Sequence, residues 1–219
     1  MLKEIETFKI GSNLLDVGCG YGFLLDEAKR KGWNVYGIDI SEEACKYAKE
    51  ALKLNVLNCD LINTKFENNF FDVICLIGVI EHLLDPVSYL KEINRISKDD
   101  GLVLITTLNI EGVVKRLNLF EYKPPEHIFY FSKKSISNLL NKNGFLVEKV
   151  SLYWKYYSLY DLVKRLEEFF LGKFNLFSFF VKKMNFQTFL IKIQTNEMIV
   201  LAKKYVGNLR DGLNKPQIK

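Results

Sequence analysis

Three glycines spaced two residues apart, Gly18, Gly20 and Gly22, follow an apolar run in the stretch LLDVGCGYGF. Glycine-rich turns can hold nucleotide-like ligands because their bare backbone approaches the ligand closely. The dinucleotide fingerprint is GxGxxG, however, and Phe23 stands where its third glycine would be. Asp16 lies two residues before the turn, where its charge would weaken the binding of a pyrophosphate. The turn therefore favours a ligand with an ammonium group and a positive centre.

Two further carboxylates follow at the expected ends of apolar segments. Asp39 comes 21 residues after Gly18, and Asp60 ends the next such segment. A carboxylate at the first position can accept hydrogen bonds from both hydroxyls of a ribose, and one at the second from an adenine amino group. With Asp16, the three acids describe a site for a cationic adenosine derivative, and S-adenosyl-L-methionine is that ligand. Each acid could instead be a helix cap or a turn residue.

The elements that must position these residues alternate along the first 108 positions. We expect strands at residues 13–17, 33–40, 55–60, 70–79 and 101–108. Helices should begin after Gly22, after a cap at Ser41, and at Asp85 with Pro86. This alternation predicts a parallel, doubly wound sheet, which binds ligands at the carboxyl ends of its strands.

The second half of the chain is less regular. We expect a helix at 132–144, capped by Ser132, and strands at 145–153 and 197–204. Residues 109–131 form a long connection, and 154–196 form an aromatic-rich insertion. Its apolar residues repeat at helical spacing from Leu159 to Phe170 and continue to Phe180, which predicts an amphipathic helix or helix pair. The insertion could cap an acceptor site, form a homodimer surface, contact a membrane surface through residues 155–193, or pack on the sheet. Residues 207–219 resemble a flexible tail.

Five stretches in this order resemble the motifs of the class I S-adenosylmethionine-dependent methyltransferases: LDVGCGYGFLL, GIDIS, NCDL, FDVICLIGVIEHLLDP and GLVLITT. The resemblance covers roughly residues 13–150 and the strand at 197–204. It implies an α/β fold in a single domain, 1–219: a doubly wound, mostly parallel seven-stranded Rossmann-like sheet with its seventh strand antiparallel and a helical insertion before that strand. It also implies a set of cofactor contacts: Gly18, Gly20 and Gly22 around the methionine half, Asp39 at the ribose, Asp60 and Leu61 at the adenine, Ile77 at the methionine side, and Ile40 as a further cofactor-binding residue.

The segment after the fourth expected strand, LIGVIEHLLDP, resembles the small-molecule branch that includes the ubiquinone-biosynthesis O-methyltransferases. The corresponding elements of DNA adenine, DNA cytosine and protein arginine methyltransferases are absent from the sequence. Some members of the branch carry Glu-x-x-Glu-His and are thought to bind a divalent metal. Here Gly78 replaces the first Glu, and only Glu81 and His82 remain. Two ligands make a poor site for a hard cation, so we predict no metal.

Methyl transfer to a hydroxyl requires removal of a proton, a task that suits histidine near neutral pH. His82 is the less favoured base, because its turn is common in the family and could simply shape the cofactor pocket. His127, in YKPPEHIFYFS, follows the fifth expected strand and should face the acceptor, either as the base or as a residue that fixes the loop. Tyr122, Glu126 and Tyr130 are weaker candidates.

Composition limits the partners and the location of the protein. The net charge is +5 but is interspersed, which is not typical of a nucleic-acid-binding face. The four cysteines include no CxxC pair and suit buried positions in a reducing compartment. No window of about 20 residues is free of charge, so we expect no membrane span and a cytoplasmic protein, or one peripheral at the inner membrane surface.

These observations predict a methyltransferase that modifies the hydroxyl of a small-molecule, sugar or lipid-linked acceptor. An apolar cap would favour a hydrophobic acceptor. Two alternatives remain: an N-methyltransferase of a small molecule or amino sugar, and a non-catalytic S-adenosylmethionine-binding module that holds a partner through its aromatic helix.

Overall fold

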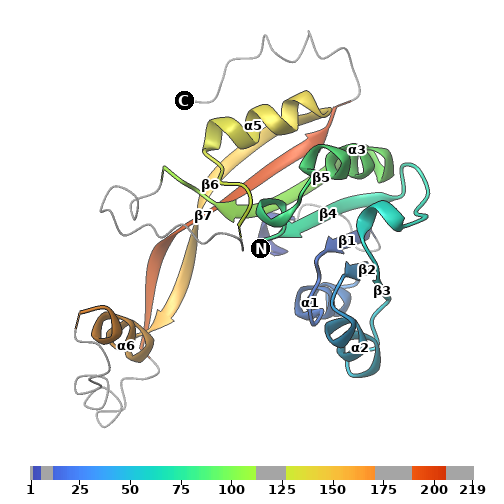
Figure 1. Ribbon diagram of the computed structural model, residues 1–219. Coiled ribbons are helices and arrows are strands. Elements are labelled where there is room, and N and C mark those ends of the chain that lie inside the picture. The colour runs from blue at the N-terminus through green and yellow to red at the C-terminus, as the bar shows by residue number, and fades with distance from the viewer. Residues whose placement is uncertain (1, 6–11, 112–126, 171–188, 206–219) are drawn as a thin grey trace. The chain divides into compact units, whose positions relative to one another are not determined.

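The structure is a computed structural model that describes residues 2–5, 12–111, 127–170 and 189–205 (Figure 1). It separates into two compact units. The first comprises Met1–Ser151 with Glu197–Lys219, and the second comprises Leu152–Asn196. The glycine turn, the three acids and both histidines all belong to the first unit.

A seven-stranded sheet in the order β3-β2-β1-β4-β5-β7-β6 organises the fold (Figure 1). Its strands are β1 Asn13–Val17, β2 Asn34–Asp39, β3 Val56–Asn58, β4 Phe71–Ile77, β5 Ser97–Leu108, β6 Phe145–Ser158 and β7 Leu190–Lys204. The pairs β1–β2, β1–β4, β2–β3 and β4–β5 are parallel, whereas β7 runs antiparallel to β5. The expected mostly parallel sheet with an antiparallel seventh strand is confirmed.

The described helices are α1 Phe23–Arg30, α2 Glu42–Glu50, α3 Pro86–Ile96, α5 Lys133–Lys142 and α6 Leu159–Phe170. Three of them, α2, α3 and α5, begin at a side chain that caps them, whereas α1 follows Gly22 without a side-chain cap. Ser41 accepts a hydrogen bond from the N–H of Ala44, and Asp85 caps α3 directly before Pro86. Ser132 forms a reciprocal capping box with Ser135. These caps were expected, because capping depends on a few neighbouring residues.

Several element boundaries differ from those expected. The strand β5 begins at Ser97, β6 continues to Ser158, and β7 begins at Leu190 instead of residue 197. The added parts of β6 and β7 are polar as well as apolar, and they are joined by bonds between distant residues. The Thr195 hydroxyl on β7 donates to the carbonyl of Tyr153 on β6, and the N–H of Leu159, directly after β6, donates to the carbonyl of Phe189, directly before β7. Because polar residues interrupt these parts of the two strands, the sequence holds no continuous apolar run there that would predict a strand.

The core lies along the middle strands of the sheet. Ile74 and Leu76 of β4 are fully buried, as are Leu90 and Ile93 on the inner face of α3. A parallel sheet covered on both faces produces long apolar runs of this kind. In the described part of the chain, no helix is both long and apolar enough to cross a membrane.

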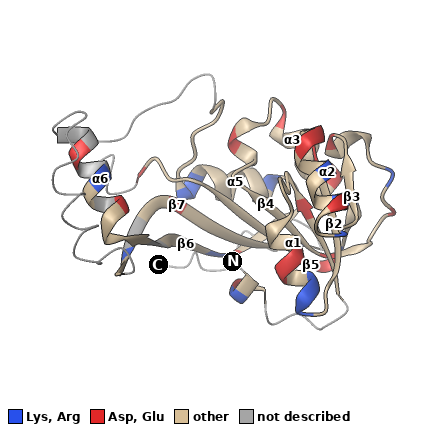
Figure 2. Ribbon diagram, turned by 90° about the horizontal axis from the view of Figure 1, so that it is seen from below, with Lys and Arg blue, Asp and Glu red and all other residues tan. Residues whose placement is uncertain are grey.

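Charges of both signs share the same surface helices, as Figure 2 shows. In α1, Asp26 precedes Lys29 and Arg30, and α2 carries Glu42 near its start and Lys49 near its end. The acids lie near the positive ends of the helix dipoles and the bases near the negative ends, which stabilises both helices. The interspersed charge of the sequence is therefore also interspersed on these two helices.

Candidate functional site

The glycine turn closes against the end of β2. The N–H groups of Gly18 and Cys19 both donate to the carbonyl of Ile38, at 2.8 and 3.0 Å. Gly18 has a φ of 73°, and a Cβ at this position would lie 2.5 Å from Cγ2 of Val79. Gly20 has a φ of 51°, but no atom of the described residues lies within 4 Å of the place where its Cβ would stand. The turn thus presents bare backbone to open space at Gly20.

Asp39, the last residue of β2, binds this turn through its side chain. Its Oδ2 accepts a hydrogen bond from the N–H of Gly20 at 2.7 Å, and its Oδ1 accepts one from the N–H of Ser41 at 2.8 Å. Each carboxylate oxygen retains a second lone pair, so the group can still accept hydrogen bonds from two ribose hydroxyls. The neighbouring Ile40 is 81% exposed, which leaves an apolar surface beside the carboxylate.

Asp16 is a buried carboxyl group beneath the turn. Its side chain is 3% exposed, and Oδ1 has no hydrogen-bond partner among the described residues. Burial, with a smaller contribution from the charge of Asp39, raises the pKa of Asp16 from 3.8 to about 8. A cationic ligand would relieve both effects, since it pairs with the carboxylate and offsets the repulsion between the two acids. These residues therefore fit the ammonium group of S-adenosylmethionine.

Asp60 lies two residues beyond β3 and is engaged at both oxygens. Its Oδ1 accepts from the N–H of Ile62 at 2.9 Å and so caps a short 3₁₀ turn at Leu61–Asn63. Its Oδ2 accepts from the hydroxyl of Tyr89 on α3. The cap role that the sequence left open is therefore real, and an adenine amino group would share the carboxylate with these donors.

The apolar residues expected around the cofactor differ in exposure. Leu61 is 1% exposed and belongs to the core, so any contact with a ligand would come from its backbone. Ile77 ends β4 and is half-buried. Ile62 is 48% exposed beside Asp60, and sequence reasoning did not select it.

The two histidines, distant in the sequence, lie side by side. The ring centroids of His82 and His127 are 4.8 Å apart. The carbonyl of Glu81 accepts from the N–H groups of Ile128 and Phe129, at 2.8 and 3.0 Å, which fixes the segment after His127 against the turn that follows β4. Oε2 of Glu81 and Nδ1 of His127 are buried and have no hydrogen-bond partner among the described residues.

Two possible metal ligands, Glu81 and His82, were counted in the sequence, and the structure brings His127 beside them as a third. One donor atom from each of Glu81, His82 and His127 lies within 4.8 Å of the others. A carboxylate with two imidazoles would suit a zinc-like ion better than magnesium or calcium. The absence of a metal, argued from two ligands, stays a prediction.

Of the weaker candidates for the base, Tyr130 lies edge-on to His127, with the two ring centroids 6.0 Å apart. Tyr122 and Glu126 lie outside the described residues.

Comparison with known proteins places this geometry in a family. A model of the methyltransferase domain family matches residues 2–150. The chain is 26% identical over 176 residues to a ubiquinone biosynthesis O-methyltransferase of Roseobacter denitrificans, covering 70% of this chain and 71% of that protein. It is 36% identical over 122 residues to the protein of the same name from Pelagibacter ubique, covering 49% and 51%. The chain thus aligns with between about half and seven tenths of these relatives.

Solved structures share the fold. A Haemonchus contortus phosphoethanolamine N-methyltransferase 2, in complex with phosphomonomethylethanolamine and S-adenosylhomocysteine, superimposes with a TM-score of 0.60 at 19% identity. The match covers 94% of this chain and 51% of that one. The family match over most of the chain, the ordered motifs and the sheet topology agree. The chain therefore belongs to the class I S-adenosyl-L-methionine-dependent methyltransferases.

Proposed function

We propose that this methyltransferase acts on the oxygen of a hydroxyl group in a small-molecule, sugar or lipid-linked acceptor, with His127 as the base. The observation that carries the proposal is the position of His127. Its imidazole lies beside His82 at the loop that follows β4, and its Nδ1 has no hydrogen-bond partner among the described residues. Nδ1 itself is buried, but His127 as a whole is only half-buried, so an acceptor can still reach the residue.

The residues of the chain divide into binding and proton-transfer roles. Asp39 holds the ribose, Asp16 pairs with the ammonium group, and the backbone at Gly20 gives room for the methionine half. The bound cofactor supplies an electrophilic methyl group on a sulfonium. The His127 imidazole would accept the hydroxyl proton as the acceptor oxygen takes up the methyl group, and S-adenosylhomocysteine would be the leaving product.

Similarity to the ubiquinone biosynthesis O-methyltransferases supports oxygen as the acceptor atom. The aromatic insertion at 154–196 supports a hydrophobic or lipid-linked acceptor, because it would supply apolar surface as a cap. Residues 171–188 of this insertion lie outside the described residues. Its alternative uses, as a homodimer surface or as a peripheral membrane contact through residues 155–193, remain predictions.

The experiment uses S-adenosylmethionine labelled in the methyl group, with a lipid extract and a water-soluble metabolite extract as separate acceptor pools. We expect label in an O-methyl product, identified by mass spectrometry. His127→Ala should lower transfer by about 100-fold or more while S-adenosylhomocysteine still binds. Near-normal transfer by that variant would remove His127 as the base. An N-methyl product would favour the amine alternative, and cofactor binding without transfer to either pool would favour the non-catalytic one.

A further inference from the structure

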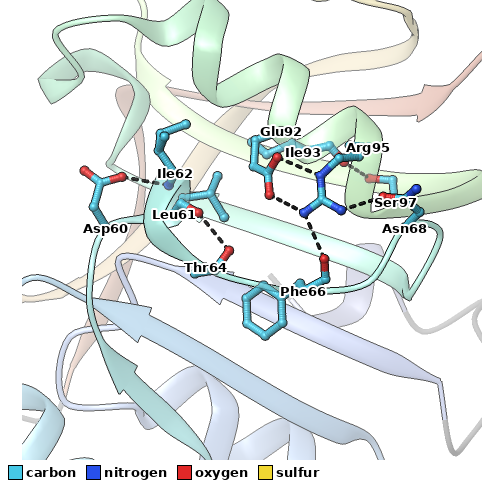
Figure 3. Close-up of polar contacts among 10 residues, drawn as sticks. All are labelled: Asp60, Leu61, Ile62, Thr64, Phe66, Asn68, Glu92, Ile93, Arg95 and Ser97. Atoms are coloured by element: carbon cyan, nitrogen blue, oxygen red, sulfur yellow. Dashed lines mark hydrogen bonds and ion pairs between the residues drawn. The ribbon is translucent and has the colours of Figure 1, made fainter.

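The helix α3 holds the segment after β3 at two separate points. At one end, the Tyr89 hydroxyl donates to Oδ2 of Asp60. At the other end, Arg95 donates through Nη2 to the carbonyl of Phe66 at 2.8 Å and through Nη1 to Oδ1 of Asn68, as Figure 3 shows. The two points lie on one helix and hold one segment, but only the first involves an acid expected to contact the ligand.

The carboxylate of Asp60 is fixed in orientation by donors on both oxygens. The N–H of Ile62 holds Oδ1 at 2.9 Å, and the half-buried Tyr89 holds Oδ2. Burial, followed by the hydrogen bond and the charge of Asp60, raises the pKa of Tyr89 well above its ordinary value, so the phenol stays protonated as a donor. A hydrogen bond to an ionised carboxylate is stronger than one between neutral groups. The Tyr89 hydroxyl is therefore placed to prevent the carboxylate from turning toward solvent.

We propose that Tyr89 is a positioning residue for the adenine of the cofactor and acts through Asp60 to set the preference for a 6-amino purine. The inference rests on the proposed function, with the adenine of the cofactor at Asp60 as expected from the sequence. An ionised carboxylate accepts a hydrogen bond from an amino group but repels a carbonyl oxygen at the same place. This preference is strongest when the carboxylate is held still, and holding it is what the Tyr89 hydroxyl does.

The test compares two ligands by calorimetry: S-adenosylhomocysteine and its deaminated form, S-inosylhomocysteine, which has a carbonyl in place of the amino group. The wild-type protein should bind the first about tenfold or more tightly than the second. Tyr89→Phe keeps the ring and removes only the hydroxyl, so it should fold and reduce this ratio about fivefold. Asp60→Asn should reduce the ratio as well, and adding Tyr89→Phe to it should have little further effect.

Arg95→Met is the matched control, since it releases the other end of the same segment. It should lower the thermal midpoint and leave the ratio of affinities unchanged. A Tyr89→Phe ratio equal to that of the wild type would overturn the proposal, as would a wild-type ratio near one or an unchanged ratio in Asp60→Asn. Because no acceptor is used, these results are independent of whether transfer goes to oxygen and whether His127 is the base.

Discussion

The carboxylate of Asp39 accepts a hydrogen bond from the N–H of Gly20 at 2.7 Å, which joins the end of β2 to the turn after β1. The same carboxylate is expected to bind the ribose of the cofactor. Its second oxygen accepts from the N–H of Ser41, the residue that caps α2. One side chain therefore links the turn, a strand and the start of a helix, so the cofactor should meet a preformed site.

We expect Asp39→Ala to weaken binding of S-adenosylhomocysteine by about tenfold or more and to lower the free energy of unfolding by about 1–3 kcal/mol. The variant should remain folded under the assay conditions, so its weaker affinity should not result from a smaller folded fraction. Ser132→Ala, which removes the cap of α5, is the matched control. It should cost about 1 kcal/mol of stability and leave the affinity unchanged. Equal affinities for Asp39→Ala and wild type, measured by calorimetry, would show that Asp39 serves only the fold.

Two glycines of the turn should respond differently to alanine. Gly20→Ala meets open space within the protein and costs only the strain of a positive φ, about 1–2 kcal/mol, but its methyl group projects where the cofactor should lie. Gly18→Ala also meets Val79 and should cost about 2–4 kcal/mol. Denaturant unfolding and cofactor titration of both variants test this. Gly20→Ala with wild-type affinity would contradict the assigned position of the ligand.

Asp16 should make cofactor binding depend on pH. With its pKa raised to about 8, the carboxyl is mostly protonated at pH 7 in the free protein. The ammonium group of the ligand favours the ionised form, so binding should release a proton. Affinity for S-adenosylhomocysteine should rise by up to about tenfold per pH unit below pH 8, then level off. Asp16→Asn should remove this dependence, and calorimetry in buffers of different ionisation enthalpy would count the proton.

The stability of the ligand-free protein should change with pH in the opposite sense. Because the pKa of Asp16 is higher in the folded protein than its ordinary value of 3.8, the folded state binds more protons over that range. The contribution of Asp16 to the free energy of unfolding should therefore fall as pH rises from about 4 to about 8. The difference in the free energy of unfolding between wild type and Asp16→Asn, measured as a function of pH, isolates the contribution of Asp16. A difference that grows in favour of the wild type with rising pH would contradict the raised pKa.

Local features were predictable from the sequence, whereas contacts between distant segments were not. Ser41, Asp85 and Ser132 were expected as caps because capping involves residues three or four positions apart. Asp39 and Asp60 were expected at strand ends because the apolar segments stop there. The partner of Asp60 was missed, although a half-buried tyrosine usually needs a partner for its hydroxyl, a signal that could have selected Tyr89.

The pairing of His82 with His127 was also missed, for a similar physical reason. The two residues meet because Glu81 binds the backbone after His127, and nothing local in either segment indicates this contact. The early start of β7 at Leu190 likewise depends on pairing with residues far away in the chain. The type of side chain was enough to select candidate site residues, but only the folded structure shows which of these residues lie together.

The base assignment leads to a prediction about metals. If His127 takes up a proton, its imidazole must keep a free lone pair, which a bound cation would occupy. Exhaustive dialysis against a chelator should therefore leave methyl transfer unchanged, and elemental analysis of the purified protein should find less than one divalent ion per chain. Loss of transfer on dialysis, with recovery on addition of zinc, would instead make Glu81, His82 and His127 a metal centre.

The central claim is that a positively charged methyl donor binds at the carboxyl ends of β1 to β4, held by Asp16 and Asp39. Calorimetric titration of the purified protein with S-adenosylmethionine, S-adenosylhomocysteine and a nicotinamide dinucleotide tests it most directly. We predict binding of the first two at one site per chain and none of the third. Binding of the dinucleotide without binding of either sulfur ligand would contradict the account.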